Sequence, residues 1–297
     1  MTKSQFCGIV FVAVATFGAR AAEPERADRS VAIRGCAGTY AGAPRGADGH
    51  VDAQRLLGEL KDLHADTYNW LIWTADTDWD DLRAFLPLAR DAGIRMWVTL
   101  VPPSESPPKA KRYSEPFRLD YERWAAEIAK LGVAHPNLVA WSIDDFTHNL
   151  AFFTPAKMRA ITAATRAVNP KLAFVPCSYF PRVTAKFAAD YAGTIDGVLF
   201  PYRHESNKAN LTDASLLKPE VARLREILGP DVLVVVDVYS TAHSRLGPST
   251  PAYVRDVMTQ ARATADGVVV YCHPDPKGKD AEKYPVVREV FSSKPRP

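Results

Sequence analysis

Aspartates follow apolar runs at two places in the chain, and both are candidates for carboxylate chemistry. Asp237 comes directly after residues 233–236, and Asp144 and Asp145 come directly after residues 138–143. A carboxylate at the end of a buried strand is costly unless it is paired, hydrogen-bonded or open to a cleft. Paired carboxylates can act as general acid, base or nucleophile. The alternative is structural: an ion pair for Asp237, and a loop cap for one of the other two.

A third polar cluster follows the apolar residues 197–201. It consists of Tyr202, Arg203, His204 and Glu205. Glu205 could serve as an acid or base, and Arg203 could hold a carboxylate, sulfate or phosphate with its planar guanidinium group. The alternative is a salt bridge between Arg203 and Glu205 on the rim of a site.

The elements that must position these residues alternate along the chain. Short β-branched and aromatic runs predict strands at residues 31–36, 67–73, 95–101, 138–144, 172–179, 197–202, 233–239 and 267–272. Between them, apolar residues at helical spacing predict helices at residues 52–64, 79–92, 121–131, 155–168, 215–228 and 251–263. Several strands are continuously apolar, which is typical of parallel sheets covered on both faces.

Eight such βα units over about 250 residues predict an α/β protein with a single (β/α)8 TIM barrel. An open doubly wound sheet is the alternative, but no G-x-G-x-x-G follows the first predicted strand. In a barrel, the strand ends that carry the acids form the functional face. Alternation then predicts that Asp144 points inward with Ala140 and Ser142, and that Asp237 and Tyr239 share one side. Residues 102–116, rich in proline, should overhang this face.

Composition excludes several classes of protein. The 297 residues are 47% hydrophobic and 24% charged, which is the mix of a folded globular protein rather than a disordered one. The formal net charge is only +3, without a block of Lys or Arg, so nucleic acid is not expected as a partner. The apolar run at the N-terminus is too short to span a membrane, and the sequence offers no other candidate span. The sequence leaves the oligomeric state open.

The N-terminal residues have the pattern of a secretory signal peptide. Lys3 is followed by an uncharged, mostly apolar run at residues 7–17 and by the Ala19-Arg20-Ala21 cleavage pattern. We therefore expect residues 1–21 to be removed, leaving residues 22–297 as the barrel domain of a secreted or periplasmic protein. Three cysteines would remain, and a bond between Cys36 and Cys272 is conceivable because they end the first and last predicted strands.

The strand rhythm and the acids at strand ends resemble the (β/α)8 glycoside hydrolase superfamily, although no single family motif is matched. By that resemblance, Asp144 or Asp145 corresponds to an acid on strand four, and Glu205 or Asp237 to its partner on strand six or seven. The expected activity is cleavage of a glycosidic bond in a poly- or oligosaccharide. We expect Asp144 to be the general acid and Asp237 to be the nucleophile or base. Asp145 and Glu205 are the alternative candidates for these roles. No cofactor or metal is expected.

Aromatic and basic side chains near these acids are candidates for sugar binding. Trp73 closes a strand and could form a platform under a sugar ring, although most Trp and Tyr residues serve packing. The other candidate substrate-binding residues are Tyr202, Arg203, His204, Tyr239, His243, Arg245 and His273.

Three other functions fit the same barrel. One is a non-catalytic glycan-binding protein. Another is a metal-dependent hydrolase that uses Asp144, His204, Asp237, His243 and His273, although the first strand lacks a His-x-His pair. The third is a lyase that acts on uronic acids. Tyr202, Arg203 and His204 would suit abstraction of a proton beside a neutralised carboxylate.

Overall fold

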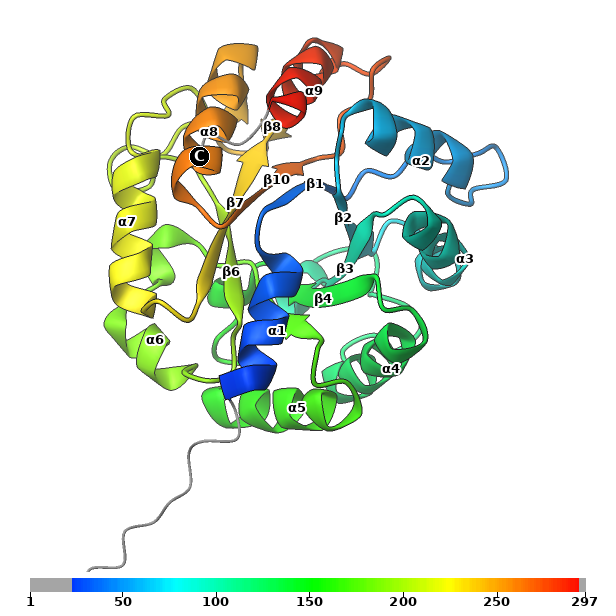
Figure 1. Ribbon diagram of the computed structural model, residues 1–297, viewed down its shortest axis with the longest axis vertical. Helices are drawn as coiled ribbons and strands as arrows, with labels where there is room; N and C mark the ends of the chain where they lie inside the picture. The colour runs from blue at the N-terminus through cyan, green and yellow to red at the C-terminus, as the bar shows by residue number, and fades with distance from the viewer. Residues whose placement is uncertain (1–22, 294–297) are drawn as a thin grey trace, which may run out of the picture.

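Parallel pairing between neighbouring strands arranges the chain as a barrel, seen end-on in Figure 1. The computed structural model describes residues 23–293, so the predicted signal peptide lies outside the described residues. The barrel strands are β1 (Cys36–Tyr40), β2 (Thr67–Ile72), β3 (Arg95–Leu100), β4 (Leu138–Ile143), β5 (Ala173–Phe174), β6 (Gly197–Pro201), β7 (Leu233–Tyr239) and β10 (Gly267–Tyr271). Their order in the sheet is β5-β4-β3-β2-β1-β10-β7-β6. This order confirms the predicted TIM barrel.

Backbone hydrogen bonds between the two outer strands, β5 and β6, close the barrel. The Asp196 amide donates to the Phe174 carbonyl at 3.0 Å, and the Ser178 amide donates to the Leu199 carbonyl at 2.8 Å. Cys177 forms an isolated parallel bridge with Leu199. Closure leaves neither strand with an unpaired edge.

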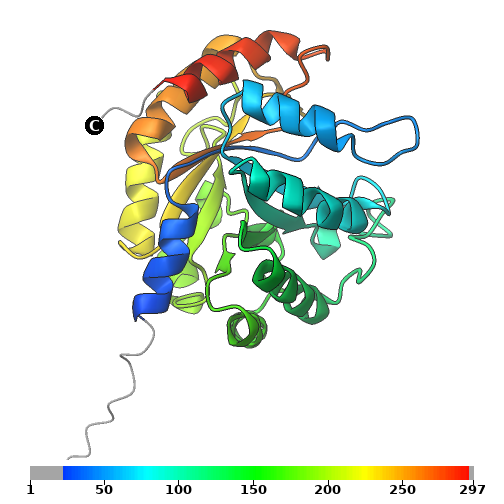
Figure 2. The ribbon, with the colours of Figure 1, turned by 45° about the vertical axis from the view of Figure 1, so that its right-hand side comes forward.

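Helices surround the strands in Figures 1 and 2. They are α1 (Glu23–Ile33), α2 (Ala53–Asp62), α3 (Asp78–Asp91), α4 (Tyr121–Ala134), α5 (Pro155–Val168), α6 (Ala185–Asp190), α7 (Leu217–Leu228), α8 (Pro251–Thr264) and α9 (Tyr284–Ser292). The Thr154 and Thr250 hydroxyls accept hydrogen bonds from the amides of Lys157 and Tyr253, and so cap α5 and α8. None of the described helices is both long and apolar enough to cross a membrane.

Side-chain alternation separates two layers of core. Ala140 and Val235 belong to the cluster inside the barrel, whereas Trp141, Ile143 and Val236 belong to the cluster between strands and helices. This is the predicted arrangement, with small residues of β4 facing inward.

The prediction that the first strand spans residues 31–36 is wrong. Val31 to Ile33 form the last turn of α1, and β1 starts only at Cys36. Ile33 is fully buried in the interior cluster, while Val31 is 72% exposed, so the apolar run is one face of a helix. Arg29 of this helix forms a buried ion pair of 2.8 Å with Asp196, just before β6. Helix α1 therefore lies against the N-terminal ends of the strands, as Figure 2 shows.

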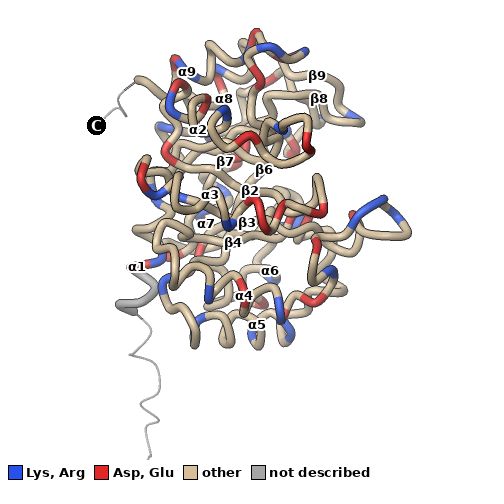
Figure 3. Tube along the Cα trace, turned by 90° about the vertical axis from the view of Figure 1, so that its right-hand side faces the viewer, with Lys and Arg blue, Asp and Glu red and all other residues tan. Residues whose placement is uncertain are grey.

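Charged residues of both signs are interspersed along the chain (Figure 3). This agrees with the small net charge of the sequence.

Candidate active site

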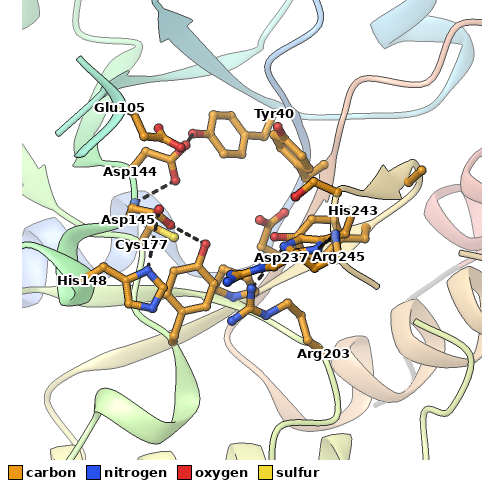
Figure 4. Close-up of a pocket in the computed structure, with 16 residues that line it drawn as sticks. Tyr40, Glu105, Asp144, Asp145, His148, Cys177, Arg203, Asp237, His243 and Arg245 are labelled. Atoms are coloured by element: carbon orange, nitrogen blue, oxygen red, sulfur yellow. Dashed lines mark hydrogen bonds and ion pairs between the residues drawn. The ribbon is translucent and has the colours of Figure 1, made fainter. Parts of the chain in front are cut away.

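A cavity of about 410 Å³ lies at the C-terminal ends of the barrel strands (Figure 4). Seven of the twelve residues predicted for the site line it: Asp144, Asp145, Arg203, Asp237, Tyr239, His243 and Arg245. The size is that of a small-molecule site. The barrel thus brings together acids from β4 and β7 that are about ninety residues apart in the sequence.

Asp144 points into the cavity, as strand alternation predicts. The Tyr40 hydroxyl donates to its Oδ2 at 2.8 Å, and the Asp145 amide donates to its Oδ1 at 2.9 Å. Burial and the neighbouring charge of Asp145 raise the pKa of Asp144 to about 6, although these hydrogen bonds act in the opposite direction. Asp144 therefore titrates close to neutral pH.

Asp145 lines the same cavity, although alternation alone would place it on the other side of the strand. Its backbone lies in the left-handed region with φ of 44°, which ends β4 and turns the side chain back. The Tyr179 hydroxyl donates to Asp145 Oδ1 at 2.5 Å, and His148 Nδ1 lies 3.6 Å from Oδ2. Burial alone would raise the pKa of Asp145, but the contacts with His148 and Tyr179 lower it below its ordinary value.

Asp237 is the most desolvated acid of the cavity. It is 3% exposed, and its Oδ1 has no hydrogen-bond partner among the described residues. Burial, followed by the charge of Asp144, raises the pKa of Asp237 well above its ordinary value. Burial therefore favours the protonated form of Asp237, whereas the contacts with Tyr179 and His148 favour the ionised form of Asp145.

Glu105 reaches the cavity from the loop after β3. It lies in a short 3-10 helix (Pro103–Glu105), within the proline-rich segment predicted to overhang this face. Burial and the charges of Asp144 and Asp145 raise the pKa of Glu105 to about 8. The sequence places Glu105 after strand three, but its proximity to the β4 acids depends on the loop conformation.

Basic groups lie on the β6 and β7 side of the cavity. Arg203 is 6% exposed, and its guanidinium group lies 4.1 Å from the centre of the Tyr179 ring. It pairs through Nη2 with Glu205, whose side chain is not among the residues that line the cavity. His243 belongs to the short ribbon of β8 (Ala242–His243) and β9 (Gly247–Pro248), and Arg245 lies in the turn between them.

The remaining four predicted residues lie outside the cavity. Tyr202 is fully buried, and its hydroxyl donates to the Asp213 carbonyl at 2.9 Å. His204 Nε2 lies 3.2 Å from a carboxylate oxygen of Asp213. The Trp73 indole donates to a backbone carbonyl at 3.3 Å in the proline-rich loop.

His273 is likewise held away from the cavity. Its Nδ1 lies 2.9 Å from the Thr39 hydroxyl, and its Nε2 lies 2.9 Å from Glu59 Oε2 in α2. Because His204 and His273 are both outside, the residues of the metal-dependent alternative are not brought together. A different group has metal-ligand spacing among the described residues: Asp144, Asp145 and Cys177, whose ligand atoms lie within 4.8 Å of one another.

The cavity is also lined by residues that the sequence analysis did not select, among them Tyr40, Glu105, His148, Cys177, Tyr179 and Tyr271. Most of them lie at or shortly after a strand end, as the selected residues do, so position alone does not separate the two groups. The residue type of the tyrosines does not mark them as site residues either, because most tyrosines serve packing.

The three cysteines of the described chain are free thiols. Cys36 is the first residue of β1, where it pairs with Gly267 at the start of β10. Cys272 directly follows the other end of β10. The two thiols therefore lie at opposite ends of paired strands, and no bond joins them.

No family model and no curated protein matches the chain. Solved structures do match it. A GH113 β-1,4-mannanase aligns with a TM-score of 0.60 and 11% identity over 88% of this chain and all of its own. The endo-β-1,4-mannanase of Thermotoga petrophila gives a TM-score of 0.59 and 11% identity over 87% of this chain and 76% of its own. The fold is that of the (β/α)8 glycoside hydrolases.

A longer enzyme aligns as well. The β-glucuronidase 2 of Bacteroides uniformis gives a TM-score of 0.55 and 12% identity over 81% of this chain. The chain spans only 30% of that protein's length. At these identities the matches establish the architecture and no more.

Proposed function

We propose that this protein is a glycoside hydrolase whose active site is the cavity at the C-terminal ends of the strands. The observation that carries the proposal is the pair of acids with opposite pKa shifts, Asp145 and Asp237, lining one cavity. Glycosidic cleavage requires one carboxyl group that is protonated and one that is ionised. Environments that separate two pKa values in this way mark acid and base roles.

Asp237 is the general acid in this proposal. It donates its proton to the glycosidic oxygen as the bond to the anomeric carbon breaks. The sequence led us to expect Asp144 in this role and Asp237 as nucleophile or base. The electrostatics of the cavity favour Asp237 as the general acid instead. Its burial, without a hydrogen-bond partner at Oδ1, stabilises the protonated form of its carboxyl group.

Asp145 is the nucleophile or base, since Tyr179 and His148 stabilise its ionised form. It either attacks the anomeric carbon or removes a proton from the attacking water. Asp144 lies beside it, is held by the Tyr40 hydroxyl and accepts from the Asp145 amide, so it helps to fix the backbone of Asp145.

Tyrosine rings provide the apolar wall of the sugar site. Tyr271 packs against Tyr40 at 5.2 Å and against Tyr239 at 5.4 Å, measured between ring centres. All three rings line the cavity, and the Tyr40 hydroxyl also contacts Asp144. They take the role that the sequence assigned to Trp73.

We propose that the enzyme acts outside the cytoplasm, on the basis of the N-terminal pattern at residues 1–21. Export would remove these residues, which lie outside the described part of the chain. N-terminal sequencing of the protein recovered from the culture medium or periplasm tests this, and an intact Met1 in that fraction would contradict it.

The experiment that tests catalysis is release of reducing ends from a panel of glycans. The names of the structural neighbours suggest β-mannans, glucuronides and galacturonides as the first substrates. The wild-type protein should release reducing ends, and the variant Asp237→Asn should release at least a hundredfold less. A sugar that binds without turnover in either protein would favour a glycan-binding barrel, and an unsaturated product would favour a lyase.

A further inference from the structure

The tautomer of His243 is set by its neighbour in the turn. The backbone amide of Arg245 donates to His243 Nδ1 at 3.1 Å, so this nitrogen carries no hydrogen. Burial and the charges of Arg203 and Arg245 lower the pKa of His243, which keeps the ring neutral. A neutral ring that accepts at Nδ1 must carry its hydrogen on Nε2. His243 Nε2 is therefore a hydrogen-bond donor.

A second donor faces this nitrogen. Arg203 Nη1 lies 3.4 Å from His243 Nε2, and a guanidinium group can only donate. Two donors cannot satisfy each other, so both require an acceptor oxygen placed between them. Glu205 occupies only Nη2 of Arg203, and Arg203 Nε has no partner among the described residues. The protein itself thus leaves this pair of donors unsatisfied.

A further positive charge lies beside them. Arg245 lines the cavity, and its guanidinium group forms no ion pair with any residue in the described part of the chain. Figure 4 shows Arg203, His243 and Arg245 together on one side of the cavity, with Glu105 and Asp144 on the other. The basic donors of the cavity therefore lie on the β6 and β7 side, where Asp237 lies as well.

We propose that Arg203, His243 and Arg245 form a subsite for an anionic substituent, a carboxylate or a sulfate, on the sugar bound in the cavity. The substrate is accordingly an acidic glycan. One oxygen of the substituent accepts from Arg203 and His243, and Arg245 contributes a second charge-assisted hydrogen bond. This inference rests on the proposed function, because it places a sugar in the same cavity.

Calorimetric titration of the full mature protein with sugars that differ only at C6 tests the subsite. The probes are galacturonate, galactose 6-sulfate and galactose, and the corresponding glucuronate, glucose 6-sulfate and glucose. We expect at least one acidic sugar to bind tenfold or more tightly than its neutral counterpart. A preference for the uronate identifies a carboxylate site, and a preference for the sulfated sugar identifies a sulfate site.

Variants connect the preference to the three residues. Arg245 is exposed, so Arg245→Gln should fold normally and weaken binding of the acidic sugar about tenfold, with the neutral sugar within twofold. Arg203→Lys keeps the positive charge but loses the planar guanidinium group, and it should also weaken binding of the acidic sugar. The matched control is Arg223→Gln on α7, where the arginine pairs with Glu226 on the surface.

Two results would overturn the subsite. Equal affinity for acidic and neutral sugars, unchanged in Arg245→Gln, would leave the hydrolase proposal intact but exclude anion recognition. Binding of none of the six sugars would also exclude it, and release of reducing ends from glycans would then report separately on the proposed function.

Discussion

The Tyr179 hydroxyl donates a hydrogen bond of 2.5 Å to Oδ1 of Asp145. The ring of the same tyrosine stacks on His148 at 4.4 Å and lies 4.1 Å beneath the Arg203 guanidinium group. Tyr179 therefore connects the ionised acid of β4 with the basic side of the cavity. Its hydroxyl stabilises the charged form of Asp145, which the proposed mechanism requires.

We predict that Tyr179→Phe raises the pKa of Asp145, because a donor to the ionised carboxylate is lost. The acid limb of the pH profile of kcat/KM should move to higher pH, and the maximal rate should fall about tenfold, as for the loss of one charge-assisted hydrogen bond. The control is Tyr121→Phe, which loses a buried hydrogen bond to the Val101 carbonyl and no contact with an acid. An unchanged acid limb in Tyr179→Phe would contradict the role of Asp145.

Asp237 should make the protein less stable as the pH rises. Its pKa is raised in the folded state, so the unfolded chain releases this proton at a lower pH than the folded protein does. Above the ordinary value near 4, stability should therefore fall with pH until the folded pKa is reached, by up to about 1.4 kcal/mol per pH unit.

The variant Asp237→Asn lacks this titration. The difference in unfolding free energy between variant and wild type should grow in favour of the variant from pH 5 to pH 8, measured by urea denaturation. Parallel pH dependence of the two proteins would show that Asp237 is ionised in the folded state.

Glu105 should limit activity at alkaline pH. Its pKa of about 8 keeps it neutral at pH 7, and its ionisation above pH 8 adds a negative charge beside Asp144 and Asp145. We predict that Glu105→Gln moves the basic limb of kcat/KM to higher pH and changes the rate at pH 6 less than threefold. Loss of activity at every pH would instead identify Glu105 as the general acid.

The ion pair of α1 should contribute to stability without affecting the site. Arg29→Met leaves Asp196 buried with one arginine fewer, and breaking a buried pair in this way costs about 3 kcal/mol. Arg223→Gln, which removes a surface pair, should cost less than about 1 kcal/mol. Both variants should keep the wild-type kcat, because Asp196 lies before β6 at the opposite end of the barrel. A loss under 1 kcal/mol in Arg29→Met would mean that α1 does not anchor the fold.

The barrel was predictable because its strands are continuously apolar and its helices carry regular apolar faces and threonine caps. The start of the first strand was not predictable, because the β-branched residues Val31 and Ile33 form a local pattern that is typical of a strand. Their position in α1 depends on the burial of Ile33 inside the barrel, where it packs with residues that are far away in the sequence.

The site was predictable to the extent that it depends on strand ends. Asp144 and Asp237 follow from alternation along β4 and β7. Asp145 does not, because only its positive φ places it beside Asp144. Tyr202 was misplaced because it alternates with Pro201 and Arg203, which line the cavity, and therefore packs in the core between strands and helices. His204 has a positive φ, of 56°, and its ring pairs with Asp213 outside the cavity.

The dependence of rate on the leaving group tests the central claim most directly. Once an active glycan is known, aryl glycosides of that sugar with good and poor leaving groups are compared in Asp237→Asn and Asp145→Asn. A general acid matters only for a poor leaving group, so Asp237→Asn should lose about 10²–10⁴-fold on the poor one and little on the good one. Asp145→Asn should lose activity on both. The reverse pattern would exchange the two roles, and wild-type rates in both variants would show that this cavity is not the active site.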